Sequence, residues 1–183
     1  MKQKAVAALR VFAASLVLVT ATILISAKAN AQLPVRTLSF AETVSPLNTP
    51  EKIASYLWKH FAFEHDQRLF GKADYWQSPS EFLSRGRGDC EDFAVFAAEA
   101  LKTHKIPAFI LNIYGQRYAH TICIFKLAGK YGAIDGTKVL KATNDDLKGL
   151  ISEIQPFWEK AAIVSPSPAS KKARIMAQFF AKS

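Results

Sequence analysis

The sequence predicts an α+β domain, with helices in the first half of the chain and strands in the second. Two observations support this prediction. Apolar residues recur at helical spacing in residues 50–61 and 90–104. Residues 108–114, 119–126 and 131–135 are short runs typical of strands. Helices followed by a group of strands indicate a helical layer packed on an antiparallel sheet.

Length and composition limit the class of protein. The chain has 183 residues, of which 50% are hydrophobic and 21% charged, and its net charge is +9. These values exclude an acidic disordered tail, a collagen-like repeat and a multi-pass membrane protein, and the length fits one domain. Two cysteines, Cys90 and Cys123, are too few for a disulfide-rich scaffold or a four-cysteine zinc site.

The first 31 residues have the pattern of a secretory signal peptide. Lys2, Lys4 and Arg10 make a basic start, residues 11–27 carry no charge, and Ala29-Asn30-Ala31 fits the small-x-small rule for cleavage. We therefore expect a signal peptide over residues 1–31 and an exported chain, either periplasmic or secreted. An uncleaved membrane anchor is the alternative, because 17 uncharged residues are near the lower limit for spanning a bilayer.

Without this segment the chain is mildly basic. It then carries 20 basic and 15 acidic side chains, a net charge of +5. This balance, the export signal and the lack of a groove-reading motif argue against nucleic acid as a partner.

Between residues 32 and 104 we expect a loosely packed leader and then three helices. The leader, residues 32–48, is weakly patterned. The first helix starts at Thr49-Pro50-Glu51, which combines a hydroxyl cap, a proline in the first turn and an acid near the positive end. A short second helix starts at Ser78-Pro79-Ser80-Glu81 and ends near Gly86. The third begins at or just before Cys90.

After the strands, the sequence predicts two more helices. One follows the Thr143–Asp146 cap. Residues 165–168 are expected to form a linker, and Lys171 to Lys182 a basic amphipathic helix. The domain would then span residues 32–164, with the linker and C-terminal helix over residues 165–183. This helix is expected to dock on the domain, and contact with an anionic membrane surface is the alternative.

Cys90 is the strongest candidate for a reactive residue. It follows Gly86-Arg87-Gly88-Asp89 and opens a predicted helix. Unpaired amides and positive potential at a helix start favour thiolate over thiol, so we expect Cys90 to have a lowered pKa. The same amides can hold a developing oxyanion. A buried, inert cysteine is the alternative.

His120 and Asp135 are expected to lie beside each other on neighbouring strands. If residues 127–130 form an even-length turn, Ile122 faces Asp135. Strand alternation then makes His120 and Asp135 diagonal neighbours on one face, within hydrogen-bonding reach. With Cys90 they would form a nucleophile–base–carboxylate triad. A surface histidine near an unrelated aspartate is the alternative.

Cys123 is expected to point into the core, because its odd position in the same strand puts it on the opposite face from His120. A Cys90–Cys123 disulfide is the alternative in an exported chain.

Asp89, Glu91 and Asp92 surround Cys90. Carboxylates near a helix start are ordinary capping residues. Clustered carboxylates also suit Ca²⁺, so calcium at these residues is the second interpretation. The predicted chemistry itself requires no cofactor.

Several sequence blocks resemble the transglutaminase-like superfamily over roughly residues 50–140. Asp74-Tyr75-Trp76 and Ser78-Pro79-Ser80-Glu81 are similar to its bacterial branch. The blocks that carry the main resemblance are, in order, Gly88-Asp89-Cys90-Glu91-Asp92-Phe93-Ala94, Lys105-Ile106-Pro107-Ala108, Tyr114-Gly115, Ala119-His120-Thr121 and Ala133-Ile134-Asp135.

The resemblance implies a papain-like core, in which a helix carrying the cysteine packs on an antiparallel sheet carrying the histidine and the aspartate. It implies Cys90 as nucleophile, His120 as general base and acid, and Asp135 as orienting carboxylate. Trp76 and Gln77 are candidates for the side-chain oxyanion donor. The chain also resembles bacterial transglutaminase-like cysteine proteases, whose carboxylates around the cysteine bind calcium.

The leading functional hypothesis is an exported thiol enzyme that acts on amide bonds of a protein or peptide. A thioester at Cys90 would yield proteolysis or deamidation with water, and crosslinking with a lysine amine. The resemblance favours a cysteine peptidase. A non-catalytic binding module with the same fold is the alternative of another class, and a calcium-gated protease is a third hypothesis.

Overall fold

The computed structural model describes residues 38–181. The predicted signal peptide over residues 1–31 lies outside this range, as do Lys182 and Ser183. The helices are α2 (Phe40–Val44), α3 (Pro50–His60), α4 (Asp66–Phe70), α5 (Pro79–Arg85), α6 (Cys90–Thr103) and α7 (Leu147–Ile154). The strands are β1 (Ala62–Phe63), β2 (Arg87–Gly88), β3 (Ala108–Tyr114), β4 (Ala119–Leu127), β5 (Lys130–Asp135), β6 (Lys138–Asn144), β7 (Lys160–Ser167) and β8 (Lys172–Phe180).

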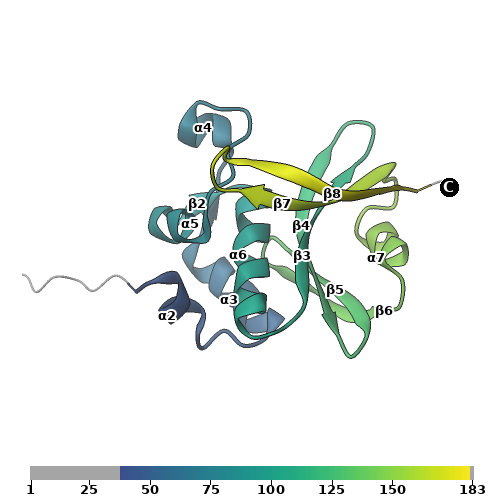
Figure 1. The fold of residues 1–183 in the computed structure, drawn as a ribbon, viewed down its shortest axis with the longest axis horizontal. Helices are drawn as coiled ribbons and strands as arrows, with labels where there is room; N and C mark the ends of the chain where they lie inside the picture. Colours follow the sequence, from purple (N-terminus) through teal and green to yellow (C-terminus); the bar gives the residue numbers. More distant parts are fainter. Residues whose placement is uncertain (1–37, 182–183) are drawn as a thin grey trace, which may run out of the picture. The chain divides into compact units, whose positions relative to one another are not determined.

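A six-stranded antiparallel sheet forms the centre of the described residues. Its strand order is β6-β5-β4-β3-β7-β8. Helices α3, α5 and α6 cover one face, and α7 covers the other (Figure 1). This arrangement is the predicted α+β architecture with a papain-like core.

Helix α6 is the centre of the larger core. Its alanines at positions 94, 97, 98 and 100 are buried, and such small side chains let the helix approach the sheet closely. Phe96 and Leu101 are fully buried beside them, packed with Cys123 and Phe125 of β4. Burial of each large apolar side chain contributes about 1.5–3 kcal/mol. This packing holds the N-terminus of α6 in place against the sheet.

The predicted helix starts are confirmed in detail. Thr49 caps α3, where its hydroxyl accepts a hydrogen bond from the Lys52 amide. Ser78 and Glu81 form a capping box on α5. Helix α5 then ends at Gly86, whose φ of +69° requires the left-handed conformation that glycine adopts without strain.

The β4–β5 hairpin has the predicted even-length turn. Lys126 pairs with Tyr131, and Leu127 with Lys130. The two residues between them, Ala128 and Gly129, both have positive φ, which matches the twist of the flanking strands. This register fixes where β5 ends relative to the start of β4.

The prediction for the C-terminal segment was wrong. Residues 160–167 and 172–180 form the antiparallel strands β7 and β8, with β7 paired to β3, so the sheet continues well past residue 164. Lys171 is the positive-φ residue that turns the chain between them. Backbone pairing to the open edge of β3 outweighs local helical periodicity. The amphipathic helix expected for docking or membrane contact is therefore not found in the described part of this segment.

Two further parts of the fold differ from the sequence-based expectation. The leader contains α2, a capped helix whose Val44 is fully buried. Strand β6 was not predicted, and it extends the sheet beyond β5. Among the described residues, no helix has the length and apolar character needed to cross a membrane.

Candidate active site

Cys90 is the first residue of α6, as predicted. It follows β2, which pairs in parallel with β1 so that Phe63 faces Gly88. Asp89 occupies the N-cap position, although its side chain makes no capping hydrogen bond. The short β1–β2 pairing and the packed helix therefore fix the position of the cysteine from both sides.

His120 and Asp135 form a hydrogen-bonded pair. The distance between His120 Nε2 and Asp135 Oδ1 is 2.7 Å, and both side chains are about a quarter exposed. His120 lies at the start of β4 and Asp135 at the end of β5, as the predicted register requires. Because Nε2 of His120 is hydrogen-bonded to the Asp135 carboxylate, Nδ1 is the ring nitrogen that remains to exchange a proton with another group.

Cys90 and His120 line the same two cavities. One has a volume of about 650 Å³ and extends from Trp76 and Asp89 to Ile175 of β8. The other has a volume of about 370 Å³, and Asp135 also lines it. The three residues that the sequence brings together as a triad thus border one cavity in the structure.

The expected lowering of the Cys90 pKa was wrong. Burial, followed by the negative charge of Glu91, raises the pKa of the Cys90 thiol to about 12. The thiol donates a hydrogen bond to Glu91 Oε2 at 3.3 Å. Burial together with two adjacent carboxylates outweighs the favourable potential of the helix N-terminus.

Cys123 lies in the core, on the face of the sheet that packs against α6. It is fully buried among apolar side chains. Both cysteines are free, so the alternative of a Cys90–Cys123 disulfide is not found.

A cluster of buried carboxylates lies beside Cys90. Asp89, Glu91 and Asp92, the predicted calcium residues, are joined by Asp66 of α4, which is only 2% exposed. Asp74 also comes within 4.8 Å of Asp66 and Glu91. One carboxylate oxygen of Asp66 and one of Asp89 are buried without a hydrogen-bond partner. Unpartnered buried carboxylate oxygens are the groups that a hard cation binds.

The cluster shifts the ionisation of its own members. Burial raises the pKa of Asp92 to about 7, although hydrogen bonds from Gln77 oppose the change. Burial raises the pKa of Asp66 to about 6. Burial, followed by the hydrogen bond and charge of Asp89, also raises the pKa of Glu91. Burial, together with repulsion between neighbouring carboxylates, therefore disfavours the charged forms in this cluster.

Gln77 and Trp76 have no free donor for an oxyanion. Gln77 Nε2 donates to the Arg87 carbonyl at 2.9 Å and to Asp92 Oδ2 at 2.5 Å. The Trp76 indole lines the larger cavity, but its N–H donates to Asp74 Oδ1 at 2.9 Å. Gln77 instead holds Asp92 of the acidic cluster in place, since its backbone N–H also donates a hydrogen bond to Asp92 Oδ1.

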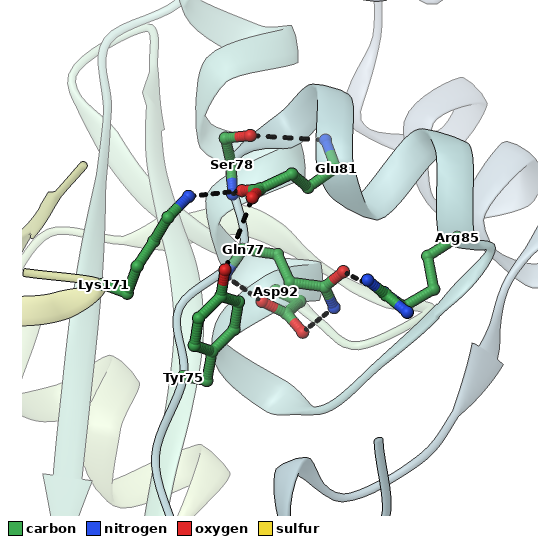
Figure 2. Close-up of polar contacts among 7 residues, drawn as sticks. All are labelled: Tyr75, Gln77, Ser78, Glu81, Arg85, Asp92 and Lys171. Carbon is green, nitrogen blue, oxygen red and sulfur yellow. Dashed lines mark hydrogen bonds and ion pairs between the residues drawn. The ribbon is translucent and has the colours of Figure 1, made fainter. Parts of the chain in front are cut away.

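A polar network ties this segment to the C-terminal hairpin (Figure 2). Lys171 Nζ lies 2.6 Å from Glu81 Oε2, and the Trp76 amide donates to the Lys171 carbonyl. Glu81 also caps α5, and Arg85 Nε donates to Gln77 Oε1 at 3.2 Å. The β7–β8 turn therefore supports the loop that orders the carboxylate cluster, a role the sequence did not reveal.

Three comparisons with known proteins bear on this geometry. No curated protein matches the chain. Calcium-bound LapG of Legionella pneumophila is similar in structure, with 24% identity over 76% of this chain and 75% of LapG, and a TM-score of 0.50. A candidate cysteine protease from Cytophaga hutchinsonii is 15% identical over 72% of this chain and 44% of that one, with a TM-score of 0.41. A TGase structure is 14% identical over 68% of this chain and 40% of that one, with a TM-score of 0.40.

The family comparison covers the helices and strands that hold the site. The model of the transglutaminase-like superfamily matches residues 37–135, which run from α2 to the last residue of β5. More than half of the chain is matched, and Cys90, His120 and Asp135 all fall inside the match. The chain belongs to the transglutaminase-like superfamily.

Proposed function

We propose that this protein is a thiol enzyme that cleaves amide bonds of proteins or peptides, with Cys90 as nucleophile, His120 as general base and acid, and Asp135 as orienting carboxylate. The observation that carries the proposal is the 2.7 Å His120–Asp135 hydrogen bond in a cavity that Cys90 also lines. This arrangement has the parts of a nucleophile–base–carboxylate triad.

The position of His120 defines how the proton moves. As Sγ bonds to the substrate carbonyl carbon, His120 Nδ1 takes the Sγ proton, while Nε2 stays hydrogen-bonded to Asp135. The C–N bond then breaks, and His120 returns that proton to the leaving amine. The product of this half-reaction is a thioester at Cys90, with Asp135 stabilising the transient imidazolium.

The second half-reaction restores the enzyme. Water gives a proton to His120 and attacks the thioester carbonyl, and the C–S bond breaks with the proton returning to Sγ. We propose hydrolysis rather than transfer to a lysine amine, because polar side chains such as Asp74, Asn112 and Thr121 line the larger cavity beside Cys90 and favour water there. We propose that the backbone amide of Cys90, at the first position of α6, helps to hold the oxyanion.

We also propose that Asp66, Asp89, Glu91 and Asp92 hold a calcium ion. Two unpartnered buried carboxylate oxygens support this site, and LapG of Legionella pneumophila has been solved with calcium bound. The ion would supply positive charge to a cluster of buried carboxylates. These four side chains also match the ligand preference of Ca²⁺, because each offers hard carboxylate oxygens.

We propose that the protein is exported, because the first 31 residues have a signal-like pattern, and that its substrates are exported or cell-envelope proteins.

Mass spectrometry of protein fragments tests the proposed activity. Cells that produce the wild-type chain or Cys90→Ala are compared, and Cys123→Ala is the matched control because Cys123 is the other free thiol. We expect a small set of fragments to disappear in Cys90→Ala and to remain in Cys123→Ala. Identical fragment sets in all three would instead favour a binding module that has kept the fold.

A further inference from the structure

The smaller cavity beside Cys90 has aromatic walls. We call it the aromatic cavity, and it is bounded by Trp58 of α3, Phe61, Phe63 of β1, Phe93 of α6 and the β5–β6 turn. Its volume is about 370 Å³, which is enough space for a large side chain. It lies next to the candidate nucleophile and is distinct from the carboxylate cluster.

The floor of the aromatic cavity is rigid. Phe61 stacks on Phe82 of α5 with ring centroids 4.3 Å apart. Phe93 is only 4% exposed and meets Phe82 edge to face at 5.0 Å. Because Phe82 is fully buried in the main core, both floor residues are held without a ligand. A preformed apolar surface binds a side chain at low entropic cost.

The rim, in contrast, exposes two large aromatic side chains. Trp58 is 73% exposed and Phe63 is 59% exposed. Single exposed apolar side chains are ordinary, but two around one cavity mark a surface that binds something. The β1–β2 pairing sets Phe63 opposite Gly88, two residues before Cys90, so this rim is tied to the nucleophile by backbone hydrogen bonds.

The charges of the two cavities differ. Among the described residues that line the aromatic cavity, the charged groups are Asp135, which is paired with His120, and Lys138 at the turn. The larger cavity is lined by three carboxylates, Asp74, Asp89 and Glu91, and by Lys172. Cys90 and His120 border both cavities, so a polypeptide with its carbonyl at Cys90 can extend into each of them.

We propose that the aromatic cavity binds a large apolar side chain, aromatic or long aliphatic, of the residue at or next to the amide bond that Cys90 attacks. This substrate preference rests on the proposed function. Trp58 and Phe63 are the specificity-determining residues, since they cover the side chain that Phe61 and Phe93 support from below. The occupant is uncharged, because the walls of the cavity offer a charged substrate group little beyond Lys138.

Alkylation of Cys90 by two reagents tests this proposal. Iodoacetamide and N-benzyl iodoacetamide react by the same chemistry, but only the second carries a ring that can enter the aromatic cavity. Rates are measured on the full-length chain by intact mass, with peptide mapping to assign Cys90, and the benzyl-to-plain ratio is divided by the same ratio for glutathione. We expect a normalised ratio of at least about fivefold, from partial burial of the ring.

Variants assign the effect to the cavity. Trp58→Ala should lower the normalised ratio by about threefold or more, because it removes most of the rim. Phe157→Ala is the matched control, since Phe157 is an exposed aromatic residue, 85% exposed, that does not line the aromatic cavity, and its ratio should stay at the wild-type value.

Two results would overturn the proposal: a wild-type ratio equal to that of glutathione, or a ratio that Trp58→Ala leaves unchanged. The ratio compares two reagents at one thiol, so it is readable whether or not the chain cleaves proteins. If the fragment sets of wild-type and Cys90→Ala are identical but the alkylation ratio is high, the cavity binds apolar groups and the proposed hydrolase activity is wrong.

Discussion

Asp135 acts on the proposed chemistry only through His120, and this makes it the sharpest single-residue test. In Asp135→Asn the amide can present its N–H to Nε2, which leaves the proton on Nδ1 and removes the base that Cys90 needs. We expect the rate at which Cys90-dependent fragments appear to fall by about a hundredfold or more. Time-resolved mass spectrometry of those fragments measures the rate.

The matched control for this change is Asp145→Asn. Asp145 forms an exposed ion pair with Lys130 at the other end of the β5 strand, so its loss should change the rate less than twofold. Equal rates for Asp135→Asn and wild-type would show that the hydrogen-bonded pair has no part in catalysis.

Alanine substitutions at two glycines, Gly88 and Gly149, should change the stability of the protein in opposite directions. A Cβ at Gly88 would lie 2.7 Å from Gln77 Nε2 and 2.8 Å from Asp92 Cβ, so Gly88→Ala must displace this buried pair. We expect a loss of about 1–3 kcal/mol in the free energy of unfolding. A Cβ at Gly149 in α7 would have no neighbour closer than 3.6 Å, so Gly149→Ala should gain about 0.5–1 kcal/mol.

Urea denaturation monitored by circular dichroism measures both changes. If Gly88→Ala leaves the free energy of unfolding unchanged or raises it, the tight packing between Gly88 and the Gln77–Asp92 pair is not present in solution.

The sequence allowed the His120–Asp135 pairing to be predicted, because strand alternation and an even-length turn are local rules. It did not allow the Cys90 pKa to be predicted. That value depends on burial and on how close Glu91 and Asp89 come to the sulfur, which neighbouring positions in sequence do not report. Asp66 was missed for the same reason, since only the tertiary fold brings α4 to the start of α6.

At the scale of elements, the ion pair between the β7–β8 turn and α5 predicts a pH dependence. The hydrogen bond from Lys171, followed by that from the Ser78 backbone, lowers the pKa of Glu81 to about 2 from its ordinary value of 4.5. A lowered carboxylate pKa contributes stability above the unfolded value, and this stability is lost as pH falls through the folded value. The contribution should therefore disappear between about pH 4.5 and pH 2.

Glu81→Gln tests this linkage. The side chain is 38% exposed, so solvent screening limits the effect to about 0.5–1 kcal/mol, and the wild-type should lose that much more stability than the variant on acidification. Glu99→Gln is the control, because its pair with Lys102 is an exposed contact within one helix. Urea midpoints at pH 5 and pH 2.5 measure the difference. Parallel acid dependence in wild-type and Glu81→Gln would contradict the prediction.

Helices α3, α5, α6 and α7 and strands β3, β4 and β5 were predictable because caps, prolines and glycines mark most of their ends locally. The C-terminal hairpin was not. Ile175, Met176, Phe179 and Phe180 fit helical spacing, yet the segment forms β8 at the edge of the sheet. What decides its conformation is the open edge of β7, which is itself placed by pairing with β3.

At the scale of the whole described domain, the start of α6 is a junction of three surfaces. The carboxylate cluster lies beside it, the larger cavity extends toward β8, and the aromatic cavity extends toward α3. The sheet supplies His120 and Asp135 to the same place. Burying several carboxylates here lowers the stability of the metal-free protein, because each charged form is desolvated and repels the others.

A cation that binds the carboxylate cluster should therefore raise the melting temperature of the whole domain. We expect calcium in about hundredfold excess over its Kd to raise Tm by about 5–10 °C relative to EGTA, measured by differential scanning fluorimetry. Asp66→Asn removes a ligand that is 2% exposed and has an unpartnered oxygen, so it should abolish most of this shift. Asp145→Asn, which changes an exposed aspartate away from the cluster, should keep the full shift. Equal melting temperatures of the wild-type chain in calcium and in EGTA would show that the cluster is not a calcium site.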